Sequence, residues 1–61
     1  MSIYQRLFDR LAADAIRGGL LTRAEVNLIA RKGTRKAPYW ARHLRDLREV
    51  IAERRRARRG G

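Results

Sequence analysis

The stretch that decides the fold is Ala37–Arg59, APYWARHLRDLREVIAERRRARR, and its pattern predicts one long helix. In its first half, four apolar residues recur at offsets of four, three and four, so their side chains share one face of a helix. These residues are Trp40, Leu44, Leu47 and Ile51. The second half has no apolar stripe, and Arg54 and Arg58 fall on the face that the apolar residues occupied. We therefore expect a helix that begins as a packing surface and ends as a cationic arm.

Two shorter helices are predicted before this stretch. The first is Ile3–Arg17, opened by a capping box in which Ser2 and Gln5 each satisfy a backbone donor of the other. Half of its helical wheel is apolar, which is typical of a helix that packs against two others. Gly18-Gly19 then supplies a left-handed C-cap and a flexible corner.

The second predicted helix covers about Arg23–Lys32, and a capping box between Thr22 and Glu25 opens it. Leu21 precedes this cap, where a hydrophobic staple packs it onto the start of the helix. Gly33 ends the helix, and a short basic turn leads to the long third helix.

Three helices joined by two short connections predict a compact all-α three-helix bundle. We expect a single domain over residues 1–53 and an Arg-rich C-terminal tail over residues 54–61, which frays without a ligand. Pro38 takes the first position of the third helix, where its missing N–H costs nothing. Leu20 has no obvious place in the monomer. The predicted core consists of Ile3, Leu7, Phe8, Leu11, Leu21, Val26, Ile29, Trp40, Leu44, Leu47 and Ile51.

Acids and arginines alternate at helical spacing on the outer face of the third helix, where ion pairs are expected to form. They would neutralise that face and leave the five arginines of the tail with few partners. The expected pairs are Arg42 with Asp46, Arg45 with Glu49 and Glu53 with Arg56.

The net charge of +10 is the strongest signal of function in the chain. Residues 1–22 carry +1, residues 23–36 carry +4 and residues 37–61 carry +5, so the positive field lies in the last two thirds. Such a field concentrates polyanions and speeds their encounter with the protein. Fourteen of the sixteen cations are Arg, whose planar group binds phosphate or carboxylate bidentately. A GC-rich genome would also favour Arg, whatever the function.

Composition excludes several classes of function. At 61 residues the core is marginal, and without Cys no disulfide or thiolate metal site can stabilise it. His43 alone makes neither a His-based metal site nor a nucleophile–base pair, so we expect no cofactor, no metal and no enzyme. No apolar run approaches the roughly 18 residues that span a bilayer. Residues 1–17 are amphipathic rather than a signal sequence, so we expect a cytoplasmic protein with no membrane partner.

The order of the second helix, a short basic turn and the third helix is similar to the layout of helix–turn–helix modules. Gly33 would be the turn glycine, Ile29 the residue four before it, and Tyr39 an apolar packing residue six after it. The resemblance implies that the third helix lies in the major groove of DNA. Arg42 and His43 would face away from the apolar stripe, with His43 at the boundary of the core. The predicted nucleic-acid-binding residues are Arg31, Lys32, Arg35, Lys36, Tyr39, Arg42, Arg54, Arg55, Arg56, Arg58 and Arg59.

These features support three hypotheses of function. The first is a small nucleic-acid-binding protein, with DNA favoured over RNA, acting as a regulatory or accessory factor of bacterial, plasmid or phage type. The second is a protein-interaction module that docks its Arg-rich face on an acidic protein surface. Small phage-encoded inhibitors, including anti-CRISPR proteins, share its size and compactness. The third is a component of a larger ribonucleoprotein. The oligomeric state is open, and a two-fold homodimer would relieve the marginal core.

Overall fold

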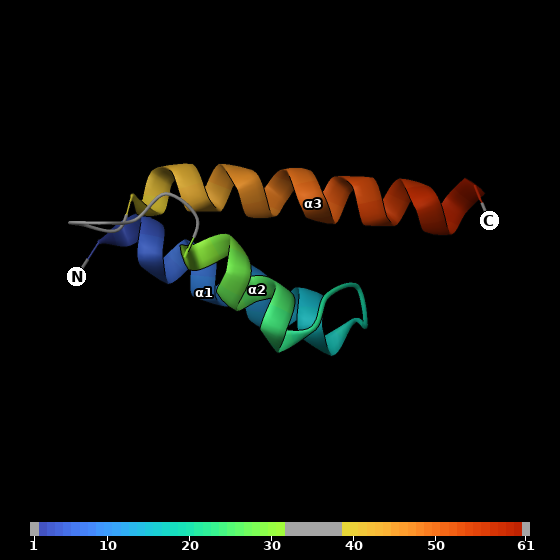
Figure 1. The fold of residues 1–61 in the computed structure, drawn as a ribbon, viewed down its shortest axis with the longest axis horizontal. Coiled ribbons are helices and arrows are strands. Elements are labelled where there is room, and N and C mark those ends of the chain that lie inside the picture. The colour runs from blue at the N-terminus through green and yellow to red at the C-terminus, as the bar shows by residue number, and fades with distance from the viewer. Residues whose placement is uncertain (1, 32–38, 61) are drawn as a thin grey trace.

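The computed structural model describes residues 2–31 and 39–60, and in these ranges it is built from three α-helices (Figure 1). The helices are α1 (Ile3–Arg17), α2 (Arg23–Arg31) and α3 (Trp40–Gly60). The chain reverses direction between α1 and α2, and α3 then runs in the same direction as α1. Both shorter helices lie on the same side of α3, which projects beyond them at its C-terminal end. The predicted all-α three-helix fold is confirmed.

Both ends of α1 are capped by local hydrogen bonds. The Ser2 side chain accepts a hydrogen bond from the Tyr4 backbone N–H at 3.2 Å, so the expected capping box with Gln5 is wrong in its partner. At the other end, Gly19 adopts a left-handed φ of 75°. Its N–H and that of Leu20 donate back into the last turn of α1, at 3.0 and 2.9 Å, in the pattern of a Schellman motif. A glycine is required here because other residues rarely adopt this φ.

The predicted capping box of α2 is confirmed. The Thr22 N–H donates to the Glu25 carboxylate at 3.0 Å, and the Glu25 N–H donates to the Thr22 hydroxyl oxygen at 3.2 Å. Leu21 and Val26, the two positions of a hydrophobic staple, are both buried in the same core. Local sequence therefore determines where the chain turns from α1 into α2.

The core lies between α3 and the two shorter helices, and α3 packs more extensively on α1 than on α2. Leu47 has no exposed surface at all. Leu20 packs against this core, so the expectation that it has no place in the monomer is wrong. The buried apolar residues are Phe8, Ala12, Ala15, Leu21, Val26, Leu44, Leu47 and Ile51, and Leu11, Ile29 and Trp40 are partly buried.

Two residues of the predicted core are exposed instead. Ile3 is 68% exposed and Leu7 is 47% exposed. The apolar half of the α1 wheel is wider than the surface that α2 and α3 can cover. The helix therefore turns Phe8, Ala12 and Ala15 inward and leaves its other apolar edge uncovered.

His43 was expected at the boundary of the core, but the structure buries it to 1% exposure. It lies three residues after Trp40 and four before Leu47, so it shares their face of α3. The Trp40 ring meets the His43 ring edge-on at 5.7 Å and the Phe8 ring at 5.4 Å. Within the described ranges, neither ring nitrogen of His43 has a hydrogen-bond partner. A buried polar group in this state costs about 1–3 kcal/mol.

We therefore predict that His43→Leu increases the free energy of unfolding by about 1 kcal/mol, because an apolar side chain of similar volume removes the unpaired nitrogens. Urea denaturation followed by circular dichroism measures the change. His43→Gln is the control, since it keeps a polar group of similar size and should bring no gain. A Leu variant no more stable than the parent would contradict this interpretation of the buried ring.

Residues 32–38 lie outside the described ranges, and the predictions for Gly33 and Pro38 lie there with them. The helix–turn–helix layout is not confirmed. The long third helix is confirmed from Trp40 onward, and it continues without a break from the domain into the predicted tail. Within the described ranges, none of the helices is long and apolar enough to cross a membrane.

Candidate nucleic-acid interface

Two arginines of α3 hold its C-terminal half against the connection between α1 and α2. One Arg54 Nη–H donates to the Leu20 carbonyl at 3.1 Å, and the other Nη forms an ion pair with the Glu25 carboxylate. One turn further on, Arg58 donates to the Gly18 carbonyl at 3.3 Å. The expectation that these two arginines have few partners is therefore wrong. Arg54 and Arg58 lie on the same face of α3 as Trp40 and Ile51, so their side chains point toward α1 and α2.

The contact with Arg58 makes use of the turn geometry. A Cβ at Gly19 would lie 3.5 Å from the Arg58 guanidinium, an ordinary van der Waals contact, so the left-handed φ rather than this approach requires the glycine. Gly18 follows the last residue of α1, where the helix dipole concentrates negative partial charge. A guanidinium at this position therefore stabilises both the helix end and the attachment of α3.

The Arg54–Glu25 ion pair changes the acidity of the glutamate. The hydrogen bond from the Arg54 guanidinium is the largest cause that lowers the pKa of Glu25 below its ordinary value of 4.5, and the Thr22 backbone N–H acts in the same direction. A lowered pKa in the folded state means that the ionised carboxylate stabilises the fold. Glu25 therefore serves two contacts, the cap of α2 and the attachment of α3.

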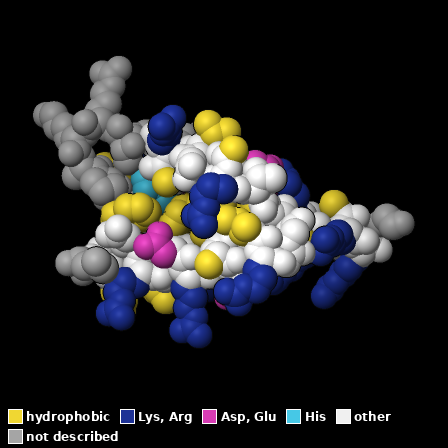
Figure 2. Space-filling model, turned by 90° about the horizontal axis from the view of Figure 1, so that it is seen from below, with side chains coloured by type: hydrophobic (Ala, Val, Ile, Leu, Met, Phe, Trp, Pro, Cys, Tyr) yellow, Lys and Arg dark blue, Asp and Glu magenta, His cyan; other side chains and the backbone are white. Residues whose placement is uncertain are grey.

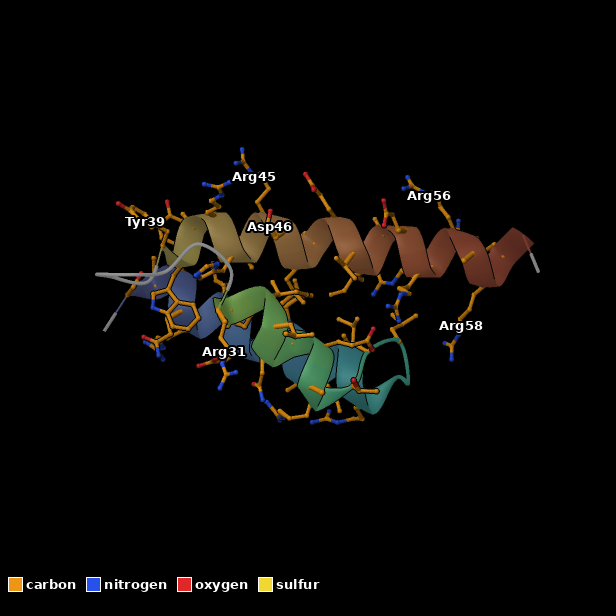
Figure 3. All side chains as sticks on the ribbon, viewed as in Figure 1. Arg31, Tyr39, Arg45, Asp46, Arg56 and Arg58 are labelled. Carbon is orange, nitrogen blue, oxygen red and sulfur yellow. The ribbon has the colours of Figure 1, made fainter. Side chains whose placement is uncertain are left out.

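The other arginines of α3 have no such partners in the described part of the chain. None of the three ion pairs expected on the outer face forms; the ion pair that α3 makes within the described ranges joins Arg54 to Glu25 on its packing side. Figure 3 shows Arg45 and Arg56 projecting from the side of α3 opposite α1 and α2, whereas Arg58 projects toward them. Among the described residues, the exposed arginines of α3 without a partner are Arg42, Arg45, Arg48, Arg55, Arg56 and Arg59.

The start of α3 brings an aromatic side chain together with two of these arginines. Tyr39 is 67% exposed, and its carbonyl accepts the first hydrogen bond of the helix from the His43 N–H at 2.9 Å. A shallow hollow on the outer side is lined by Tyr39, Ala41, Arg42 and Arg45. An aromatic ring beside two guanidinium groups can contact a base and its phosphates.

The predicted site residues thus fall into separate groups. Lys32, Arg35 and Lys36 lie outside the described ranges, and Arg31 is exposed in the last turn of α2. The structure places Tyr39 and Arg42 together, with Arg55, Arg56 and Arg59 further along α3. Arg45 and Arg48 were missed. For Arg45 the reason was the expected pair with Glu49; its place on the outer face of the same helix was the signal that could have found it.

The opposite face of the molecule has a mixed character. Figure 2 shows the side on which α1 and α2 lie, with hydrophobic side chains in its middle, one arginine side chain across them, and other arginine side chains along the edges and on the projecting end of α3. A groove between α1 and α3 combines the two chemistries and is lined by Leu7, Arg10, Leu11, Asp14, Leu44 and Arg48. Within residues 2–31 and 39–60, no group of three or more His, Asp or Glu side chains could hold a metal ion.

No protein-family model, curated protein or solved structure matches the chain.

The lowered pKa of Glu25 predicts a pH-dependent loss of stability. The stabilisation by its carboxylate is complete above the unfolded pKa, close to 4.5, and is lost as the pH falls through the lower folded pKa. Glu25→Gln should therefore lower the Tm at pH 7, and its difference from the parent should shrink as the pH falls below 4.5.

Thermal unfolding of both proteins between pH 7 and pH 3 measures this difference. The control is Glu49→Gln, because Glu49 makes no ion pair in the described structure and its removal should leave the Tm nearly unchanged. A Glu25→Gln difference that stayed constant over the whole range would argue against the ion pair with Arg54.

Proposed function

We propose that the protein binds nucleic acid, with duplex DNA as the favoured target, and acts in the cytoplasm as a small regulatory or accessory factor of bacterial, plasmid or phage type. It would be a binding protein rather than an enzyme.

The observation that carries this proposal is the set of exposed arginines on α3 that have no partner in the described structure. Six arginines of this helix are exposed and have no partner in the described structure, while Arg54 and Arg58 are used to hold the helix in place. Binding through unpaired arginines costs little free energy, because no internal contact has to be broken before they reach a phosphate. Binding that neutralises phosphates releases counterions, which supplies most of the affinity of a basic protein for DNA.

Duplex DNA is favoured over RNA because exposed aromatic side chains are few. Sequence-specific RNA binding relies mainly on bases stacked on aromatic rings. Trp40 and Phe8 pack against each other at the core. In the described ranges this leaves Tyr4 and Tyr39 as exposed aromatics; Tyr4 lies on α1, and Tyr39 lies immediately before α3. Such a surface suits contacts with a phosphate backbone better than a stacking platform.

A protein-interaction module is the second candidate, and the uncovered edge of α1 favours it. Ile3, Tyr4 and Leu7 are exposed there, next to Arg6 and Arg10. Exposed apolar side chains bordered by cations suit an acidic protein surface with an apolar centre. The same edge could also join two copies of the chain in a homodimer.

The test is a fluorescence-anisotropy titration of random duplex DNA at several salt concentrations. We predict binding that weakens with salt. A triple variant of Arg55→Gln, Arg56→Gln and Arg59→Gln should bind roughly tenfold more weakly. It should also reduce the log–log salt slope by about 0.9 for each phosphate that the protein no longer neutralises.

A second triple variant is the charge-matched control. It carries Arg6→Gln, Arg10→Gln and Arg17→Gln on α1 and removes the same three charges. It should retain most of the affinity, because its substitutions are not on α3. Equal weakening by both triples would mean that net charge alone drives binding. No binding by the parent at low salt would overturn the proposal and favour the protein-interaction module.

A further inference from the structure

The outer face of α3 has an order of charges that net charge does not explain. Arg42, Arg45, Glu49, Glu53 and Arg56 recur at offsets of three, four, four and three, so they form one stripe along the helix. All five are exposed, and none is in an ion pair in the described structure. The stripe is therefore positive at both ends and negative in the middle.

This order matches a DNA major groove at cytosine, because the groove is negative at both walls and cytosine presents its N4 amino donor on the floor. Arg45 and Arg56 are eleven residues apart, which corresponds to roughly 16 Å along the axis at about 1.5 Å per residue. The major groove is about 12 Å wide and admits an α-helix. If α3 is inclined across the groove, arginines at its two ends can reach phosphates on opposite walls while the glutamates lie over the bases.

We propose that α3 enters the major groove of duplex DNA by this outer face, and that Glu49 and Glu53 read cytosine. The inference rests on the proposed function and adds the groove, the reading residues and the base. A glutamate carboxylate accepts a hydrogen bond from the cytosine N4 amino group, whereas phosphates and the acceptor atoms of guanine repel it. Ala41 and Ala52 are exposed beside the stripe, and their small side chains permit close approach.

A second copy of the chain is the competing occupant of this face. An antiparallel pair of α3 helices would set Arg45 of each copy opposite Glu49 of the other. Exposed ion pairs of this kind contribute little, however, and the stripe has no apolar side chain to add to them. The charge order therefore fits DNA better than a dimer.

The test is selection from a random duplex library, followed by affinity measurements on the selected duplex and on one with its cytosines replaced. Three proteins are compared. They are the parent, the variant E49Q/E53Q and the control D9N/D14N, which removes the same two negative charges from α1. Circular dichroism verifies that all three remain folded.

We expect the parent to enrich cytosine at fixed positions and to prefer the selected duplex by about tenfold for each contact. E49Q/E53Q should bind random duplex more tightly but lose this preference. Any remaining preference should move to adenine, which Gln matches with a donor and an acceptor. D9N/D14N should also bind random duplex more tightly but keep the preference for cytosine.

Binding of random duplex without cytosine enrichment, or a preference that survives E49Q/E53Q, would overturn this inference and leave the proposed function intact. No binding of any duplex by the parent would overturn both. A two-copy complex in sedimentation velocity that E49Q/E53Q dissociates would assign the stripe to a dimer interface instead.

Discussion

The apolar face of α3 is the constraint on which the rest of the structure depends. A chain of 61 residues has little apolar surface to bury, and α1 and α2 must both use this face to bury theirs. Leu44, Leu47 and Ile51 are buried there, with Trp40 and His43 at the start of the helix. Both short helices lie on one side of α3, and no other helix of the described ranges lies on the opposite side (Figure 1). The proposed contact with nucleic acid lies on the side of α3 that faces away from α1 and α2.

The same geometry divides the arginines of α3 between two roles. Arg54 and Arg58 extend the apolar stripe, and at the end of the bundle they meet the carbonyls of Leu20 and Gly18, with the Glu25 carboxylate as a further partner of Arg54. Their guanidinium groups donate to carbonyl oxygens at and just after the C-terminus of α1, where intrahelical donors are lacking. Glu25 joins this contact to the cap of α2, so all three helices meet there. The other arginines therefore lie on a helix whose first half is fixed by the apolar core and whose second half is fixed by the contacts of Arg54 and Arg58.

Local signals made much of the fold predictable. The residues that cap and end the helices gave the bounds of α1 and the start of α2, and the spacing of Trp40, Leu44, Leu47 and Ile51 gave the packing face of α3. The sequence does not predict which edge of α1 is covered. The apolar half of α1 is wider than the surface that α2 and α3 can cover, and the tertiary arrangement decides which edge is buried. This is why Ala12 and Ala15 replaced Ile3 and Leu7 in the core.

The candidate site was less predictable, for a similar reason. The periodicity placed Arg54 and Arg58 on the packing face, but a sequence does not show that carbonyl oxygens lie within their reach. His43 is a polar residue in phase with the apolar stripe, and phase proved a better guide to its burial than polarity. The spacing of Arg45 and Glu49 predicts an ion pair, which does not form, and Arg45 is therefore absent from the predicted binding residues. Exposed ion pairs are weak, so sequence spacing alone does not predict them well.

The division of the arginines can be measured directly by NMR of their side-chain Nε–H groups in the protein labelled with ¹⁵N-arginine, before and after addition of duplex DNA. Arg54 and Arg58 should show the relaxation of ordered groups without DNA and change little when it is added. Arg42, Arg45, Arg55, Arg56 and Arg59 should be mobile without DNA and shift on binding. If all the arginines of α3 were equally mobile without DNA and shifted together, the two roles assigned to them would be contradicted.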